Sequence, residues 1–158
     1  MLRGQSDASA RVLVVDDNPV NLMVMSARLE SRRLVAFLAG DGAEAVALAS
    51  EMRFDLILMD LQMPILDGLA ATAAIRRLEG DCSRPPVPVL AFTSTSPGSK
   101  VLAAYGMNGS LSKPCEDREL ENCLVTWCPS YGAGSPVRSG IHGNGGFQAV
   151  RRDVVTPS

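Results

Sequence analysis

Histidine is almost absent from this chain, because its 158 residues contain only His142, in a Gly-rich segment. The four cysteines, at positions 82, 115, 123 and 128, form no Cys-x-x-Cys pair. Zinc sites combine closely spaced cysteines and histidines, so this composition argues against a zinc centre. We interpret Cys123 as a small core residue on the apolar side of an expected helix, and Cys82 as an exposed loop thiol.

Long apolar runs and a strong excess of one charge are also lacking. No stretch approaches the roughly 18 uncharged apolar residues that span a bilayer, so we expect no transmembrane helix. The first ten residues, MLRGQSDASA, lack the apolar core of a signal peptide, which predicts a cytoplasmic location. A net charge of −2 gives no electrostatic reason to expect nucleic-acid binding, and we expect no membrane partner either.

What the sequence does contain is a regular alternation of short apolar runs and helical patterns. The apolar runs at 11–15, 33–39, 55–59 and 87–92 predict four buried strands, and the segment GSLS at 109–112 predicts a brief fifth strand. Helical patterns follow each of them, with Asn18 and Asp41 placed to cap two of the helices. Strands that are apolar on both sides and joined by helices indicate a parallel sheet covered on both faces. The expected fold class is α/β: a five-stranded parallel sheet with helices on both faces, in the flavodoxin-like (βα)5 arrangement.

Particular residues are expected to form the buried faces of the helices. In the first helix, Val20, Met23, Val24 and Ala27 follow the i, i+3, i+4, i+7 spacing of an apolar face. In the last, at 116–127, the corresponding residues are Leu120, Cys123, Leu124 and Trp127.

The composition also divides the chain into three parts. Residues 1–10 are expected to be a flexible lead, residues 11–128 a single domain, and residues 129–158 a flexible tail rich in Gly, Ser and Pro. Within the tail, the segment 145–155 is the part that could form a strand or dock onto the domain. The tail carries three Arg and one Asp, giving +2, so the rest of the chain carries −4.

One polar residue or pair stands at the end of four of the five strands. Asp16 and Asp17 follow the first strand, Asp60 the third, Thr93 the fourth and Lys113 the fifth. The carboxyl ends of parallel strands meet at one edge of the sheet, so these side chains should converge. Three carboxylates repel one another, and a divalent ion removes that repulsion. Oxygen ligands favour Mg²⁺, whose charge together with that of one lysine would neutralise the three acids.

This set of side chains suits phosphoryl transfer to a carboxylate. A carboxylate can attack phosphorus and form an acyl phosphate, and the reaction then needs positioning and charge neutralisation more than proton transfer. Each of these residues alone has an ordinary structural explanation, such as a helix cap or a turn. Their joint placement at strand ends favours the chemical interpretation.

At these residues the chain resembles the receiver domain of two-component response regulators. The matching segments are VLVVDDN, LILMDLQMPILDG, LAFTS and LSKP, which follow one another in the family's order across residues 10–128. The segment VDDNPVN together with MDLQMPILDG is most similar to receivers of hybrid sensor kinases and their single-domain relatives. The resemblance therefore identifies residues 11–128 as the receiver.

The resemblance also implies a role for each site residue. Asp60 matches the phosphoacceptor, Thr93 the hydroxyl that approaches the phosphoryl group, and Lys113 the lysine that pairs with it. Pro114 matches a residue that often follows that lysine in a cis peptide. For Mg²⁺, the implied ligands are Asp17, Asp60 and the backbone carbonyl of Gln62, with Asp16 acting largely through water.

The implied partner is a sensor histidine kinase or a His-phosphotransfer protein, whose helical bundle would dock near residues 19–30. The downstream protein cannot be named from the sequence. We expect no enzymatic turnover beyond the chain's own phosphorylation and dephosphorylation.

Two departures from the family pattern concern the output side of the domain. Ser110 stands where the family has an aromatic that turns inward on phosphorylation, and Tyr105 is a weak substitute. Thr93 and Lys113 are 20 positions apart, closer than is usual in the family, which predicts a shortened or frayed fourth helix. An atypical switch is therefore expected.

Two other functions are compatible with parts of the pattern. A protein-binding scaffold that works without phosphorylation fits Ser110 and the short helix, but has no need of the acidic pocket. A phosphatase of the haloacid-dehalogenase type would also use an Asp nucleophile, but it would carry a second Asp where this chain has Gln62.

Overall fold

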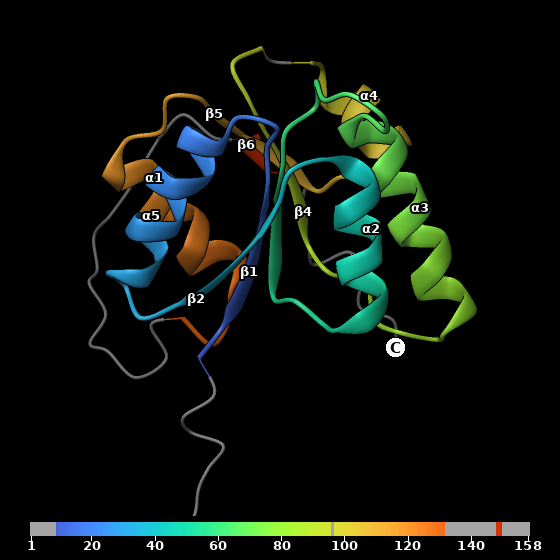
Figure 1. The fold of residues 1–158 in the computed structure, drawn as a ribbon, viewed down its shortest axis with the longest axis horizontal. Helices are drawn as coiled ribbons and strands as arrows, with labels where there is room; N and C mark the ends of the chain where they lie inside the picture. The colour runs from blue at the N-terminus through green and yellow to red at the C-terminus, as the bar shows by residue number, and fades with distance from the viewer. Residues whose placement is uncertain (1–8, 96, 132–147, 150–158) are drawn as a thin grey trace, which may run out of the picture.

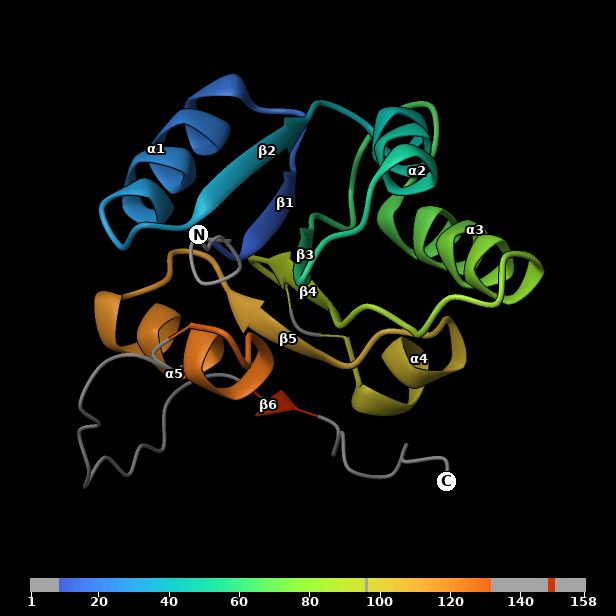
Figure 2. The same ribbon diagram turned by 90° about the horizontal axis from the view of Figure 1, so that it is seen from below.

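Five parallel strands form the centre of the protein, as the sequence predicts. The computed structural model describes residues 9–95, 97–131 and 148–149. The parallel strands follow the spatial order β2-β1-β3-β4-β5 (Figures 1 and 2). A further short strand, β6, pairs antiparallel with the outer edge of β5. The strands are β1 (Arg11–Val15), β2 (Val35–Ala39), β3 (Leu56–Met59), β4 (Val89–Thr93), β5 (Gly109–Ser112) and β6 (Gln148–Ala149).

Helices cover both faces of this sheet. The helices are α1 (Pro19–Glu30), α2 (Gly42–Glu51), α3 (Gly68–Asp81), α4 (Ser99–Ala104) and α5 (Asp117–Trp127). Figure 1 shows α1 and α5 on one face and α2, α3 and α4 on the other. Side chains of a strand point alternately to the two faces, which gives the protein two apolar cores. Val12 and Val14 join one core, with α1 and α5, while Leu13 and Val15 join the other.

Two helices begin at the caps that the sequence predicts, Asn18 and Asp41, and α3 begins at a further cap, Asp67. The side chain of Asn18 accepts a hydrogen bond from the Val20 N–H, and Pro19 occupies the first helical position. Asp41 accepts from the Glu44 N–H, and Asp67 accepts from the Ala70 N–H. These carboxylate and amide oxygens bind N–H groups that have no partner within the helix, so each helix starts at a fixed residue.

The predicted buried face of α1 is wrong. Val20, Met23 and Val24 are 61%, 63% and 52% exposed, whereas Met25 and Leu29 are buried. The helix contains two apolar stripes at helical spacing, and the sheet takes the one that includes Leu29. In α5 the prediction is confirmed, because Leu120, Cys123, Leu124 and Trp127 are all buried.

Two further predictions are confirmed, and one residue departs from expectation. Helix α4 has six residues and is shorter than α1, α2, α3 and α5. Cys82 is exposed and Cys123 is buried. Ala10, in the expected lead, is buried against the core. Residues 1–8 and most of the expected tail lie outside the described residues.

Among the residues that the structure describes, no helix combines the length and the apolarity needed to cross a bilayer.

Candidate functional site

The acidic residues at the ends of β1 and β3 come together at one edge of the sheet. Asp16 and Asp17 follow β1 directly, and Asp60 follows β3. One carboxylate oxygen from each of the three lies within 4.8 Å of the others. Asp16 and Asp60 are buried, while Asp17 is exposed. The cluster therefore consists of two buried acids and one exposed acid.

Asp16 is the most fully bonded of the three carboxylates. It is 1% exposed, and its Oδ1 accepts from the Asn18 N–H at 2.9 Å. Its Oδ2 accepts from Asn21 Nδ2 at 3.2 Å and from Lys113 Nζ at 2.6 Å. Because a buried charge needs partners, these three donors account for the stability of a carboxylate at this depth.

Asp60 has fewer partners than Asp16. Its Oδ1 accepts from the Gln62 N–H at 3.2 Å, and its Oδ2 lies 3.6 Å from Lys113 Nζ. Burial raises the pKa of the Asp60 carboxyl; Lys113 and the Gln62 N–H oppose the rise, and Asp16 and Asp17 add to it. The surroundings of Asp60 therefore disfavour its charged form, and burial is the main cause.

The loop between β3 and α3 holds the backbone of Asp60 in place. The Gly68 N–H donates to the Leu61 carbonyl at 3.2 Å. A Cβ at Gly68 would collide with the backbone carbonyl of Asp60, so only glycine allows α3 to begin this close to the acid. The Leu66 N–H donates to the Pro64 carbonyl at 2.7 Å, which closes a γ-turn around Ile65.

The residues at the ends of β4 and β5 complete this edge. Thr93 is 5% exposed, and its Oγ1 accepts from the Thr95 N–H at 3.2 Å. Lys113 extends between Asp16 and Asp60, with its Nζ 5.3 Å from the centre of the Phe92 ring. The peptide between Lys113 and Pro114 is cis. The Lys113 ammonium thus stands beside Asp16 and Asp60, and Thr93 lies at the end of the neighbouring strand β4.

Comparison with known proteins identifies the family. The profile of the response regulator receiver domain matches residues 12–125. This chain belongs to the response regulator receiver domain family. The signal transduction histidine-protein kinase BarA of Escherichia coli K12 is 39% identical to it over 133 residues, which are 84% of this chain. Those residues are only 14% of the kinase, so this chain spans a small part of that relative's length.

Solved receiver structures have the same fold. The receiver domain of the sensor histidine kinase PA1611 of Pseudomonas aeruginosa, which has a magnesium ion in its active site cleft, is 36% identical with a TM-score of 0.67. The match covers 77% of this receiver and 99% of that one. A chain in the co-crystal of the Saccharomyces cerevisiae phosphotransfer protein Ypd1 with the Ssk1 receiver has a TM-score of 0.71 at 28% identity. That match covers 80% of this receiver and 94% of the other chain.

The two departures from the family pattern lie beside β5. Ser110 is half-buried within β5, where it pairs with Ala91 of β4. Tyr105 follows the last residue of α4 and is 43% exposed. In this conformation the receiver therefore has a small hydroxyl at position 110 and a partly exposed tyrosine at position 105.

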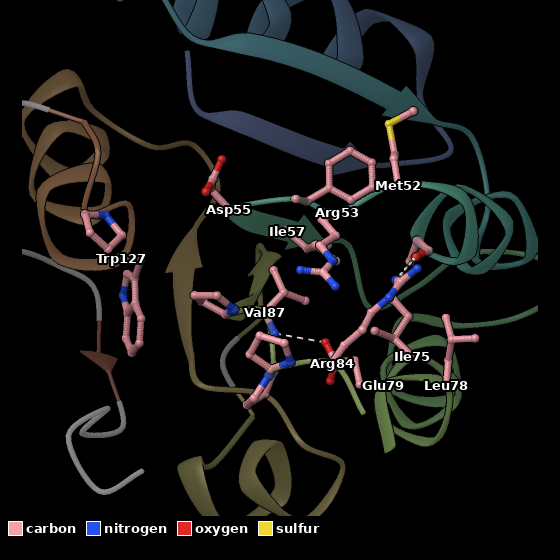
Figure 3. A pocket seen from close by; sticks show the side chains of 16 residues that line it. Met52, Arg53, Asp55, Ile57, Ile75, Leu78, Glu79, Arg84, Val87 and Trp127 are labelled. Atoms are coloured by element: carbon pink, nitrogen blue, oxygen red, sulfur yellow. Dashed lines mark hydrogen bonds between the residues drawn. The ribbon is translucent and has the colours of Figure 1, made fainter. Parts of the chain in front are cut away.

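A hollow of about 390 Å³ lies at the end of the strands opposite the acidic cluster (Figure 3). Several of its polar groups bind neighbouring backbone. Arg84 donates to the carbonyls of Ala49 and Ser50, and Glu79 accepts from the Val87 N–H. Asp55 accepts from the backbone N–H of Arg11. These contacts connect loops at the end of the strands opposite the acidic cluster.

Some contacts of the acidic cluster are not predictable from the strand ends. Asn21 reaches Asp16 from the first turn of α1, and Phe92 lies beneath Lys113. The segment VDDNPVN places Asn21 near Asp16 in the sequence, but only the angle of α1 to the sheet brings the two together. The contact of Phe92 with Lys113 could not be predicted, because an aromatic residue in a buried strand is common and points to no particular partner.

Proposed function

We propose that this receiver accepts a phosphoryl group on Asp60 in a Mg²⁺-dependent phosphorelay and signals by binding other proteins. One observation supports this most directly. Asp60 shares a cluster with Asp16 and Asp17 within 4.8 Å, and Lys113 Nζ lies 3.6 Å from its Oδ2. The two further carboxylates can hold a divalent cation beside Asp60, and that cation together with the ammonium would offset the charge of an incoming phosphoryl group.

In the proposed reaction, a carboxylate oxygen of Asp60 attacks the phosphorus of a phosphohistidine on the donor. The new O–P bond forms as the P–N bond breaks, and the electron pair of that bond returns to the imidazole nitrogen. The Lys113 ammonium neutralises charge on the phosphoryl oxygens, and the Thr93 hydroxyl donates to one of them. The chain turns over no other substrate in this proposal.

The donor set fits Mg²⁺, because it consists of oxygen ligands with an excess of negative charge. We assign direct binding to Asp17, Asp60 and the backbone carbonyl of Gln62. Asp16 would act through water, since both of its oxygens already accept hydrogen bonds from protein donors. When bound, the ion would neutralise phosphoryl charge that Lys113 alone cannot.

The exposed stripe of α1 supports a helical donor protein. Val20, Met23 and Val24 present apolar side chains on a helix next to the acidic cluster. Apolar residues at helical spacing suit docking against another helix, as in a sensor kinase or a His-phosphotransfer protein. The neighbour in complex with Ypd1 is consistent with such a donor. The cytoplasmic location stays a prediction, and the downstream partner is unspecified.

The test is chemical labelling at Asp60. With acetyl phosphate and Mg²⁺, the wild-type chain should give a slower band on a Phos-tag gel, and Asp60→Asn should not. Asp41→Asn is the matched control, because asparagine caps a helix as well as aspartate does. Removing Mg²⁺ with EDTA should abolish the slower band. Equal labelling of wild type and Asp60→Asn would reject the assignment.

Ser110 and the six-residue α4 favour a second candidate, a scaffold that binds proteins without phosphorylation. Beryllofluoride, a phosphoryl analogue, separates the two candidates when it is added with Mg²⁺ during NMR. Shifts that reach α4 and β5 support a phosphorylation switch. Shifts confined to the residues around Asp60 support the scaffold.

A further inference from the structure

The outer edge of β5 is occupied by another part of the same chain. Gly109 pairs with Ala149 and Ser110 pairs with Gln148, in antiparallel register. Figure 2 shows β6 beside β5, with α5 on one side and α4 on the other. The face that contains the two family departures therefore holds a strand contributed from far along the sequence.

Without β6, this edge would be open to association. β4 uses one edge of β5, so the backbone groups of the other edge would face outward. Gly109 and Ser110 have little side-chain bulk to obstruct an approaching strand. The helices on either side expose apolar side chains: Val101 of α4 and Val125 of α5 are 44% and 59% exposed. An edge of this kind is a template for strand pairing between molecules.

We propose that residues 148 and 149 act as an intramolecular strand that keeps the β5 edge closed to a second copy of this chain. Electrostatic attraction favours contact between the tail and the domain, because residues 129–158 carry a net charge of +2 and the rest of the chain −4. The contact is also reversible. A two-residue strand makes few hydrogen bonds, and each changes the equilibrium by roughly two- to tenfold. The closure does not depend on phosphorylation of Asp60.

Amide exchange of the full-length chain tests whether the edge is occupied. Successive N–H groups of a strand point to opposite edges, so one of the Gly109 and Ser110 amides faces β4 and the other faces β6. The double variant Gln148→Pro/Ala149→Pro removes both N–H groups of β6. One of the two β5 amides should then exchange roughly tenfold faster while the other is unchanged. Unchanged exchange of both amides would overturn the proposal.

The control variant is Ser139→Pro/Gly140→Pro, which adds the same number of prolines to the same segment of the sequence. It should exchange like the wild type at both β5 amides.

Sedimentation velocity tests whether the occupied edge prevents association. With rising concentration, the Gln148→Pro/Ala149→Pro chain should form a dimer, while the wild type and the control remain monomeric. A double-proline chain as monomeric as the wild type would show that β6 does not close the edge against a second copy. Dimers of the wild type that match those of the variant would contradict the proposal equally.

Discussion

Lys113 is bound more closely to Asp16 than to Asp60, with Nζ–Oδ2 distances of 2.6 Å and 3.6 Å. Asp16 is also the more deeply buried of the two acids. The lysine therefore serves first as the partner of a buried carboxylate, and stands within reach of the residue proposed to accept phosphorus. Structure and chemistry thus depend on the same ammonium.

Lys113→Ala should lower both stability and phosphorylation. Asp16 would lose its charged donor but keep those of Asn18 and Asn21, so we expect the chain to fold with a loss of about 1–3 kcal/mol. Labelling of Asp60 by acetyl phosphate should fall by on the order of 100-fold, because a charge on the phosphoryl oxygens is no longer neutralised. Urea denaturation in EDTA and Phos-tag gels measure the two effects. Lys100→Ala, at an exposed residue of α4, should change neither.

Asp60→Asn should stabilise the metal-free chain at neutral pH. Burial raises the pKa of Asp60 above 3.8, so the folded chain holds that proton more tightly than the unfolded chain does. Stability therefore falls as pH rises from 3.8 through the raised pKa. Asparagine removes this loss, and the melting temperature at pH 7 should rise by about 2–5 °C.

Thermal melts from pH 3.5 to pH 7, in steps of about one pH unit, would measure this effect. The difference in melting temperature between Asp60→Asn and the wild type should become smaller as pH falls. Adding Mg²⁺ at pH 7 should stabilise the wild type more than the variant, because the variant lacks one proposed ligand. A variant less stable than the wild type in EDTA at pH 7 would contradict the prediction.

The placement of the acidic cluster could be predicted because it follows from topology alone. Asp16 and Asp60 each come directly after a short apolar run, and Lys113 comes directly after the short strand Gly109–Ser112. Parallel strands bring such positions to one edge. No knowledge of side-chain packing is needed for that step. The individual hydrogen bonds, such as the one from Asn21 to Asp16, depend on the angle of a helix to the sheet and so could not be predicted.

Other features depend on a choice that the sequence leaves open. Helix α1 has two apolar stripes, and periodicity cannot say whether Met23 or Met25 faces the sheet. Ile65 has φ 69°, which its β-branched side chain disfavours, so propensity argues against the turn that it forms. The chain adopts this turn because few residues connect Asp60 to Gly68, where α3 begins.

Ile65→Gly should stabilise the protein. Ile65 sits at the centre of a γ-turn with positive φ, and 78% of its surface is exposed, so little packing offsets the strain. Glycine adopts this backbone freely, and we expect a gain of about 1 kcal/mol after its own entropy loss. Ile65→Ala is the matched control, because it keeps the Cβ and should gain less than half as much. Equal stability of all three chains in urea would show that the turn stores no strain.

Met23→Glu should impair phosphorylation by a protein donor while sparing phosphorylation by a small molecule. Met23 lies on the exposed apolar stripe of α1 and is 63% exposed, so the fold should tolerate the change. A charge there would be desolvated against a docking helix, and the rate of transfer from a His-phosphotransfer protein should fall by on the order of tenfold. Labelling by acetyl phosphate should be unchanged. Val125→Glu, at a 59% exposed position of α5, is the control and should transfer at the wild-type rate. If the two variants lose transfer equally, the donor does not dock on the α1 stripe.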